Sequence, residues 1–360
     1  MTPVLLKTLT RSIDRIKLIL SSKKRSSIRH QPYTRDYSHL TRQEYLEHPE
    51  LFYRKPPPVN QVRILRTEFV RGFKRSYLTF QSPYQTPYLE NNTVYGIYTT
   101  VDKPGTADWV LIVLHGWGRP HFRIEKKMCL TLARHGISSL LLTMPYHQER
   151  APAGSWSGEY MISGDVVRTA ESFQQTIAEV QAIIPWLRQK FHRVGIFGMS
   201  LGGIIAHLAM TVEPFDAGIT LLAGGNSAKI VWEGQMTQYV REDIERAGIT
   251  LEQLELIWLA TNPTNLAPRN RVKNLLMING QFDEIIPVSY TLELWEALGK
   301  PPIKWYPCAH YSSYFFLKRI LRDIVEFIAT IQESGVISPY TLTLSPPRDN
   351  KITNPLTPEI

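Results

Sequence analysis

The sequence predicts an α/β fold, with a mostly parallel central sheet, helices on both faces and a small helical insertion. Short apolar runs alternate with helical patterns between residues 110 and 306, which is typical of parallel strands joined by crossover helices. The chain has 360 residues, 43% of them hydrophobic and 20% charged. These values suit a globular protein that buries a large core.

Residues 1–60 are interpreted as a basic helix followed by an arm that ends in three prolines. Apolar residues recur at helical spacing at Leu5, Leu9, Ile13, Ile16 and Leu20, whereas the charged residues off this stripe are Lys7, Arg11, Asp14 and Arg15. Two interpretations stay open. The stripe packs against the domain with the charges in solvent, or the helix rests on an anionic membrane surface.

The positive charge is concentrated at the N-terminus. The formal net charge is +9, and residues 1–30 carry eight Lys or Arg residues against Asp14 alone. The remainder is nearly neutral, which argues against a nucleic-acid groove across the fold. An anionic membrane reached through residues 1–30 is therefore a candidate partner, and nucleic acid is not.

Other features point to a cytoplasmic protein, peripheral to a membrane if the basic helix binds one. Cys129 and Cys308 provide no disulfide framework, and the histidines lack metal-ligand spacing. No apolar run approaches the roughly 20 residues of a membrane-spanning helix, and the N-terminus lacks the order of a secretory signal. We expect no metal and no cofactor.

The main domain is expected over residues 61–335, before a poorly ordered tail at 336–360. Antiparallel strands with turns at Gly72 and Asn91-Asn92 are expected over 62–101. The strands that follow are predicted at 110–114, 137–142, 194–197, 217–222, 272–278 and 303–306, with helices at 124–134 and 166–190. Residues 226–271 interrupt this alternation as an insertion with helices at 228–247 and 251–260, which is either peripheral or a cap over the substrate pocket.

A serine occupies the turn between a predicted buried strand and a helix, in Gly198-Met199-Ser200-Leu201-Gly202. Such a turn pushes the hydroxyl clear of the sheet, and glycines two residues on either side avoid a collision. A bare G-x-S-x-G pattern also arises by chance as a glycine-rich turn. The case for a nucleophile therefore depends on the rest of the chain.

A serine nucleophile needs a base, and His310 is the best candidate because it follows the last short strand and comes last in the chain. The competing histidines are His115, His121, His147, His192 and His207. Asp283, in the loop after the strand that ends at Gly280, is the candidate acid. Glu284 is its rival, but the following Ile285-Ile286-Pro287 favours a turn that leaves Glu284 facing water.

Two further stretches border the expected site. The oxyanion donors would be the backbone N–H groups of Leu201 and of Trp117 in His115-Gly116-Trp117-Gly118. In residues 145–150, the side chains of Tyr146, His147 and Arg150 are candidates for binding a carboxylate or phosphate of the substrate. The alternative is a loop held by its own hydrogen bonds and an arginine ion pair.

With these motifs, HGWG at 115–118, GMSLGG at 198–203, GQFDEIIP at 280–287 and His310, the sequence resembles the α/β-hydrolase superfamily, in its serine esterase and dienelactone-hydrolase-like branch. The resemblance covers about residues 75–335. It implies the α/β-hydrolase fold, a Ser200-Asp283-His310 triad and oxyanion donors at Trp117 and Leu201. The segment at 145–150 also looks like one in less-studied bacterial members and their lipid-acting eukaryotic relatives.

The expected activity is hydrolysis of a carboxylic ester through an acyl-enzyme, without a cofactor. Trp117, Trp156 and Trp232 favour an apolar acyl group, and the basic helix favours a lipid ester. Two alternatives stay open. An alcohol in place of water would make the protein an acyltransferase, and a catalytically silent member of the fold would serve as a binding protein at a membrane surface.

Overall fold

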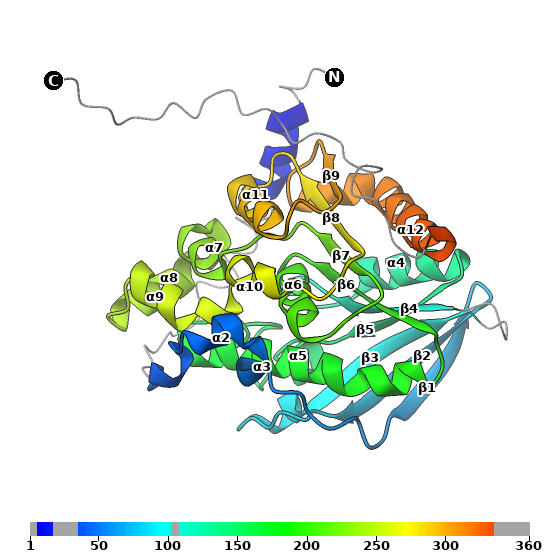
Figure 1. Cartoon of the computed structure of the whole chain (residues 1–360), viewed down its shortest axis with the longest axis horizontal. Coiled ribbons are helices and arrows are strands. Elements are labelled where there is room, and N and C mark those ends of the chain that lie inside the picture. The colour runs from blue at the N-terminus through cyan, green and yellow to red at the C-terminus, as the bar shows by residue number, and fades with distance from the viewer. Residues whose placement is uncertain (1–5, 17–34, 102–107, 335–360) are drawn as a thin grey trace.

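The computed structural model describes residues 6–16, 35–101 and 108–334. Its centre is one nine-stranded sheet in the order β1-β2-β3-β5-β4-β6-β7-β8-β9 (Figure 1). The strands are β1 (Arg63–Val70), β2 (Phe73–Gln81), β3 (Thr93–Thr100), β4 (Trp109–Leu114), β5 (Ile137–Leu142), β6 (Arg193–Met199), β7 (Gly218–Leu221), β8 (Leu275–Gly280) and β9 (Ile303–Tyr306). The predicted α/β-hydrolase fold is confirmed.

The sheet has two parts with different strand directions. Strands β1 to β3 pair antiparallel, with a turn at Gly72 as predicted, and β3 pairs antiparallel with β5. From β5 to β9 every pairing is parallel. Crossover connections therefore bring the carboxyl ends of these six strands, and the loops after them, to one edge.

Strand β4 shows why this sheet is covered on both faces. All six of its residues are buried, and alternate side chains join different hydrophobic clusters, since Val110 and Ile112 lie in one and Leu111 and Val113 in the other. This follows from the two-residue repeat of a strand. Continuous apolar strands, rather than alternating ones, are the expected result.

Helices cover both faces of the sheet (Figure 1). Side chains of α4 (Arg123–Arg134) and α12 (Leu317–Ser334) belong to one cluster, and those of α5 (Val166–Arg188) and α6 (Leu201–Val212) to the other. Helix α11 (Val288–Ala297) contributes Leu294 to a third, smaller cluster with β8 and β9. The predicted helices at 124–134 and 166–190 are confirmed within two residues.

Between β7 and β8 the chain forms several short helices in place of the two predicted long ones. They are α7 (Ser227–Glu233), α8 (Gln238–Arg246), α9 (Leu251–Ile257) and α10 (Pro263–Leu266), with 3₁₀ turns at Gln235–Thr237, Leu259–Thr261 and Ala267–Arg269. The prediction of one helix over 228–247 is wrong at Gly234, which has an extended ψ of 130°. A helical insertion nevertheless lies where the alternation of strands and helices stops.

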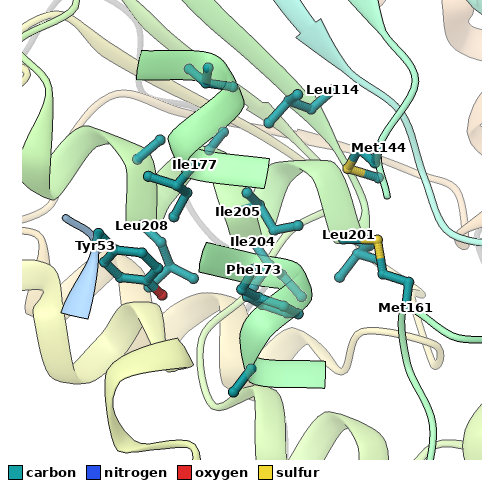
Figure 2. Close-up of a cluster of buried hydrophobic side chains, with 14 of the residues drawn as sticks. Tyr53, Leu114, Met144, Met161, Phe173, Ile177, Leu201, Ile204, Ile205 and Leu208 are labelled. Carbon is teal, nitrogen blue, oxygen red and sulfur yellow. The ribbon is translucent and has the colours of Figure 1, made fainter. Parts of the chain in front are cut away.

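Part of the expected arm packs into the main core. Short helices α2 (Glu44–Glu47) and α3 (Pro49–Phe52) bury Tyr45 and Phe52, and Tyr53 is 1% exposed. The hydroxyl of Tyr53 donates to the carbonyl of Ala260 at 2.8 Å. Figure 2 shows Tyr53 among the buried side chains of α5 and α6, so residues 44–53 are part of the domain's core.

The N-terminal segment is helical over residues 6–16. Its inward face differs from the expected apolar stripe, because Leu9 and Ile16 are 50% and 58% exposed while Asp14 is 2% exposed. Ile13 is half-buried, and Leu5 and Leu20 lie outside the described residues. The expectation that the charges face solvent is therefore wrong for Asp14, whose carboxylate meets the domain. The expected tail at 336–360 also lies outside the described residues.

Candidate active site

Ser200 lies at the turn from β6 to α6 with a φ of 54° and a ψ of −122°. A non-glycine residue at positive φ is strained, and such strain concentrates at functional sites. The turn leaves no room for larger neighbours. A Cβ atom at Gly198 would lie 2.2 Å from the carbonyl oxygen of Gly202, and one at Gly202 would lie 2.4 Å from that of Leu114.

His310 reaches Ser200 from the loop after β9. Its Nε2 atom lies 3.0 Å from the Ser200 Oγ atom, and its Nδ1 atom lies 2.7 Å from Oδ2 of Asp283. Because Nδ1–H donates to the carboxylate, Nε2 is left as an acceptor for the serine hydroxyl. This arrangement can remove the proton of Ser200.

Asp283 is held in the loop after β8. Its other oxygen, Oδ1, accepts the backbone N–H groups of Ile285 and Ile286 at 2.9 and 3.0 Å. The rival acid Glu284 points elsewhere, with its Oε1 atom 3.0 Å from Nε of Arg11 and its side chain 38% exposed. The structure thus brings Asp283, and not Glu284, to His310.

The charges around His310 favour its protonated form. Burial by itself lowers the pKa of His310, but the charge and hydrogen bond of Asp283 and the charge of Asp14 outweigh it, so that the pKa is raised above its ordinary value. The Arg119 guanidinium acts weakly in the opposite direction. An imidazolium that forms during proton transfer is therefore stabilised.

The loop after β4 supplies the other wall of the site. Gly116, Trp117, Ser200 and Leu201 line the same cavity, so both residues expected to supply oxyanion donors border the cavity that contains Ser200. A Cβ atom at Gly116 would lie 4.0 Å from the Ser200 Oγ atom, and glycine there keeps the space around the hydroxyl open. The indole Nε1–H of Trp117 donates to the carbonyl of Gly158 at 2.7 Å.

His115, the first residue of the HGWG motif, serves this loop and not the proton transfer. Its Nε2 atom accepts the backbone N–H of Met144 at 3.0 Å, and its Nδ1 atom lies 2.8 Å from the carbonyl of Gly116. Burial and the neighbouring His147 hold the pKa of His115 well below its usual range. A neutral imidazole therefore fixes the position of the loop.

The cavity at Ser200 has a volume of about 190 Å³ and a mainly apolar lining. Most of its apolar residues come from α4 to α6, from the insertion and from the segment around α12. They include Ile124, Met128, Ile162, Phe173, Ile204, Ile230, Val231, Met236, Trp258, Tyr311, Tyr314, Leu317 and Ile320. The insertion therefore forms part of the cavity wall. Trp117 and Trp258 supply the indoles, whereas Trp156 packs on Trp117 and Trp232 lies against Arg241, outside this lining.

The segment at 145–150 is a buried structural loop. The guanidinium of Arg150 is fully buried and makes two hydrogen bonds of 2.6 and 2.8 Å to the carboxylate of Glu179. It also donates to the carbonyls of Thr143 and Asn91 at 2.8 and 2.6 Å. Arg150 therefore has its charge neutralised within the fold, away from the cavity at Ser200.

His147 and Tyr146, the other two candidates in this segment, also lie outside the cavity at Ser200. The Nε2 atom of His147 accepts the backbone N–H of Gly118 at 3.1 Å, and burial lowers the pKa of His147 to about 4. Tyr146 is 3% exposed and borders a different, polar hollow. Of the three residues expected to bind a substrate carboxylate or phosphate, none lines the cavity with Ser200.

Three residues of the site escaped sequence analysis. Asp14 lies 296 positions from His310, and its place in a basic amphipathic helix carried no signal of contact with the site. Arg119 directly follows HGWG, so its position in the loop after β4 was a usable signal. Trp258 lies in the insertion, whose arrangement over the sheet the sequence does not specify.

Among the described residues there is no group of three or more His, Cys, Asp or Glu side chains that could hold a metal ion. Within the same residues, each helix is too short or too polar to cross a bilayer.

Comparison with known proteins agrees with this fold. Residues 102–247 match the family model "Alpha/beta hydrolase domain containing 18". The chain is 30% identical over 98 residues to the uncharacterized protein YdjC of Bacillus subtilis, and this match covers 27% of this chain and 84% of that protein. The chain belongs to the α/β-hydrolase superfamily.

Two further relatives extend this comparison. An uncharacterized protein of Mycobacterium tuberculosis strain H37Rv is 26% identical over 312 residues, covering 81% of this chain and 72% of the relative. A carboxymethylenebutenolidase homolog of Mus musculus is 29% identical over 137 residues, covering 37% of this chain and 52% of the relative. The second relative supports the dienelactone-hydrolase-like branch.

Among solved structures, the chain shares its fold with acetyl xylan esterases. The enzyme of Thermoanaerobacterium sp. JW/SL YS485 matches with a TM-score of 0.61 and 17% identity over 83% of this chain and 95% of that one. The enzyme of Paenibacillus sp. R4 matches with a TM-score of 0.60 and 15% identity, over 82% of this chain and 96% of that one.

Proposed function

We propose that this protein is a serine esterase that cleaves a carboxylic ester with an apolar acyl group. The observation that carries the proposal is the pair of contacts made by His310, 3.0 Å to the Ser200 hydroxyl and 2.7 Å to the Asp283 carboxylate. The esterase activities of proteins with the same fold support it.

In the first half-reaction, Ser200 Oγ attacks the ester carbonyl carbon while its proton passes to His310 Nε2. The carbonyl oxygen becomes an oxyanion, which the backbone N–H groups of Trp117 and Leu201 stabilise. As the tetrahedral intermediate collapses, the carbon–oxygen bond of the leaving alcohol breaks and His310 gives that alcohol its proton. Ser200 then carries the acyl group.

In the second half-reaction, water replaces the alcohol. His310 accepts a proton from water and the hydroxyl adds to the acyl carbon. As the second intermediate collapses, the bond between the acyl carbon and Ser200 Oγ breaks, His310 gives its proton to Ser200 and the acid is released. Asp283 holds the imidazole tautomer throughout. The apolar cavity, with Trp258 and Ile230 in its wall, favours an aliphatic or aromatic acyl group over a charged one.

The test is labelling with a fluorophosphonate, which forms a covalent bond with an activated serine. We expect the wild type to be labelled and to hydrolyse p-nitrophenyl esters, and Ser200→Ala to do neither while keeping its thermal unfolding temperature. A wild type that is neither labelled nor active would favour the silent binding protein. An ester product that forms with added alcohol at the expense of free acid would favour the acyltransferase.

We also propose that the N-terminal helix contacts an anionic membrane, because its outer side combines apolar and basic residues. Leu9 and Ile16 are half-exposed or more, and Lys7 and Arg15 are exposed beside them. Apolar contact and charge attraction together drive such interfacial binding. Co-flotation with phosphatidylserine vesicles, reduced in Leu9→Ser/Ile16→Ser, would support it, and absence of wild-type flotation would refute it.

A further inference from the structure

A carboxylate from the N-terminal helix contacts the backbone of the loop that carries His310. Oδ2 of Asp14 accepts the backbone N–H of His310 at 2.7 Å, and Oδ1 accepts that of Tyr311 at 3.0 Å. Asp14 is 2% exposed. The two carboxylate oxygens thus accept hydrogen bonds from two successive backbone N–H groups, the first of which belongs to the proposed base.

This contact is strong because the carboxylate is charged and shielded from water. Burial of an unpaired carboxylate is costly, and hydrogen bonds from two backbone N–H groups to a charged acceptor offset that cost. The neighbouring ion pair between Arg11 and Glu284, at 3.0 Å, ties the same helix to the loop that carries Asp283. The helix therefore contacts both loops that build the proposed catalytic group.

Given the serine esterase proposed above, we infer that Asp14 is a positioning residue for His310, through which the N-terminal helix holds the loop after β9 in place. Asp14 fixes the backbone from which the imidazole extends, whereas Asp283 fixes the ring itself. Without Asp14, the peptide groups of His310 and Tyr311 lose an acceptor, and the imidazole loses its alignment with Ser200.

Asp14 also acts through its charge. The charged groups that face His310 are Asp283 on one side, Asp14 on the N-terminal helix and Arg119 in the loop after β4, and the two carboxylates raise the pKa of His310. The pKa of Asp14 itself is raised, first by burial and also by Asp283, although His310 and the two backbone N–H groups oppose this. Loss of the Asp14 charge should lower the pKa of His310.

The test compares Asp14→Ala and Asp14→Asn with Ser12→Ala, a control on the exposed side of the same helix. Steady-state hydrolysis of a p-nitrophenyl ester gives kcat, KM and the acid limb of kcat/KM against pH. We expect kcat of Asp14→Ala to fall roughly 10- to 100-fold, which is the loss typical when a hydrogen-bonding partner that orients a metal ligand is removed. KM should stay within about twofold, and the acid limb should move to lower pH.

Asp14→Asn keeps the shape and one acceptor oxygen but removes the charge. We expect the same movement of the acid limb with a smaller loss of kcat, and Ser12→Ala should match the wild type in both. If Asp14→Ala fails to fold, Asp14→Asn alone decides the question through its pH profile.

The inference is overturned if both Asp14 variants lower only the unfolding temperature while kcat and the acid limb remain those of the wild type. This failure is distinct from failure of the proposed function. In the first case the wild type is active and labelled at Ser200. In the second the wild type shows neither activity nor labelling.

Discussion

The Nε2 atom of His310 lies 3.0 Å from Oγ of Ser200, and the two residues are 110 positions apart along the chain. Three loops at the carboxyl edge of the parallel strands, after β6, β8 and β9, supply Ser200, Asp283 and His310.

Asp283→Asn should leave the fold intact and lower kcat by about 10³- to 10⁴-fold, since an amide in place of the carboxylate favours the wrong tautomer of His310. Glu293→Gln is the control, because Glu293 is an exposed carboxylate in α11, the helix that follows this loop. Steady-state kinetics of both variants should show a large loss for the first only. Equal losses would contradict the assignment of Asp283.

The pH dependence follows from the raised pKa of His310. Protonated His310 cannot accept the serine proton, so kcat/KM should fall as the pH decreases through that pKa. Because the pKa is raised, the midpoint of this acid limb should lie above the ordinary histidine value. A midpoint below that value, measured with a neutral ester, would contradict the account of the charges around His310.

Arg150→Ala should destabilise the protein by about 3–5 kcal/mol, because it leaves the carboxylate of Glu179 buried and unpaired. The control is Arg241→Ala, whose ion pair with Glu245 is about 40% exposed and is expected to contribute under about 1 kcal/mol. Urea unfolding gives both values. A raised KM for Arg150→Ala with unchanged stability would instead support the expectation that Arg150 binds the substrate.

Gly202→Ala should disrupt the turn at Ser200, because its methyl group would lie 2.4 Å from the carbonyl oxygen of Leu114. We expect a loss of about 1–3 kcal/mol or more from this overpacking. Gly116→Ala is the comparison, since its nearest neighbour would be at 3.5 Å, and its unfolding temperature should stay near that of the wild type. Thermal unfolding of both variants makes the comparison.

Ile230→Phe should narrow the cavity at Ser200 from the side of the insertion. The ratio of kcat/KM for an octanoate ester to that for an acetate ester should fall, because a smaller apolar pocket excludes the longer chain. Trp232→Phe, two residues away but outside the cavity lining, should leave this ratio unchanged. An unchanged ratio for Ile230→Phe would place the acyl group elsewhere.

Local pattern was enough to predict the sheet and the sharp turn at Ser200. The buried strands are continuous apolar runs, and Gly198 is required by backbone contacts with Gly202 and Gly203, within a few residues, whereas Gly202 is required by the carbonyl oxygen of Leu114 in the neighbouring strand β4. The choice of Asp283 over Glu284 also rested on a local turn, and the structure brings Asp283 to His310. The apolar runs, Gly198 and the turn at Asp283 depend on residues that are close together in the sequence, and the pattern around the serine is itself local.

Features that depend on distant partners were less predictable. The buried partner of Arg150 is Glu179, which lies in α5, and no periodicity links the two positions. The amphipathic pattern of the N-terminal helix was visible in the sequence. The side that meets the domain carries Asp14, which accepts the N–H groups of His310 and Tyr311. Patterns within one helix carry no information about such acceptors.

The contact between Asp14 and His310 spans 296 positions and so has a consequence for biosynthesis. Chains are made from the N-terminus at about 5–20 residues per second, and Asp14 therefore leaves the ribosome well before its partner exists. The hydrolase domain can complete this contact only after position 311 has emerged. A nascent chain therefore lacks the contact of Asp14 with this loop until residue 311 has been made, and the proposed esterase activity should appear only after that point.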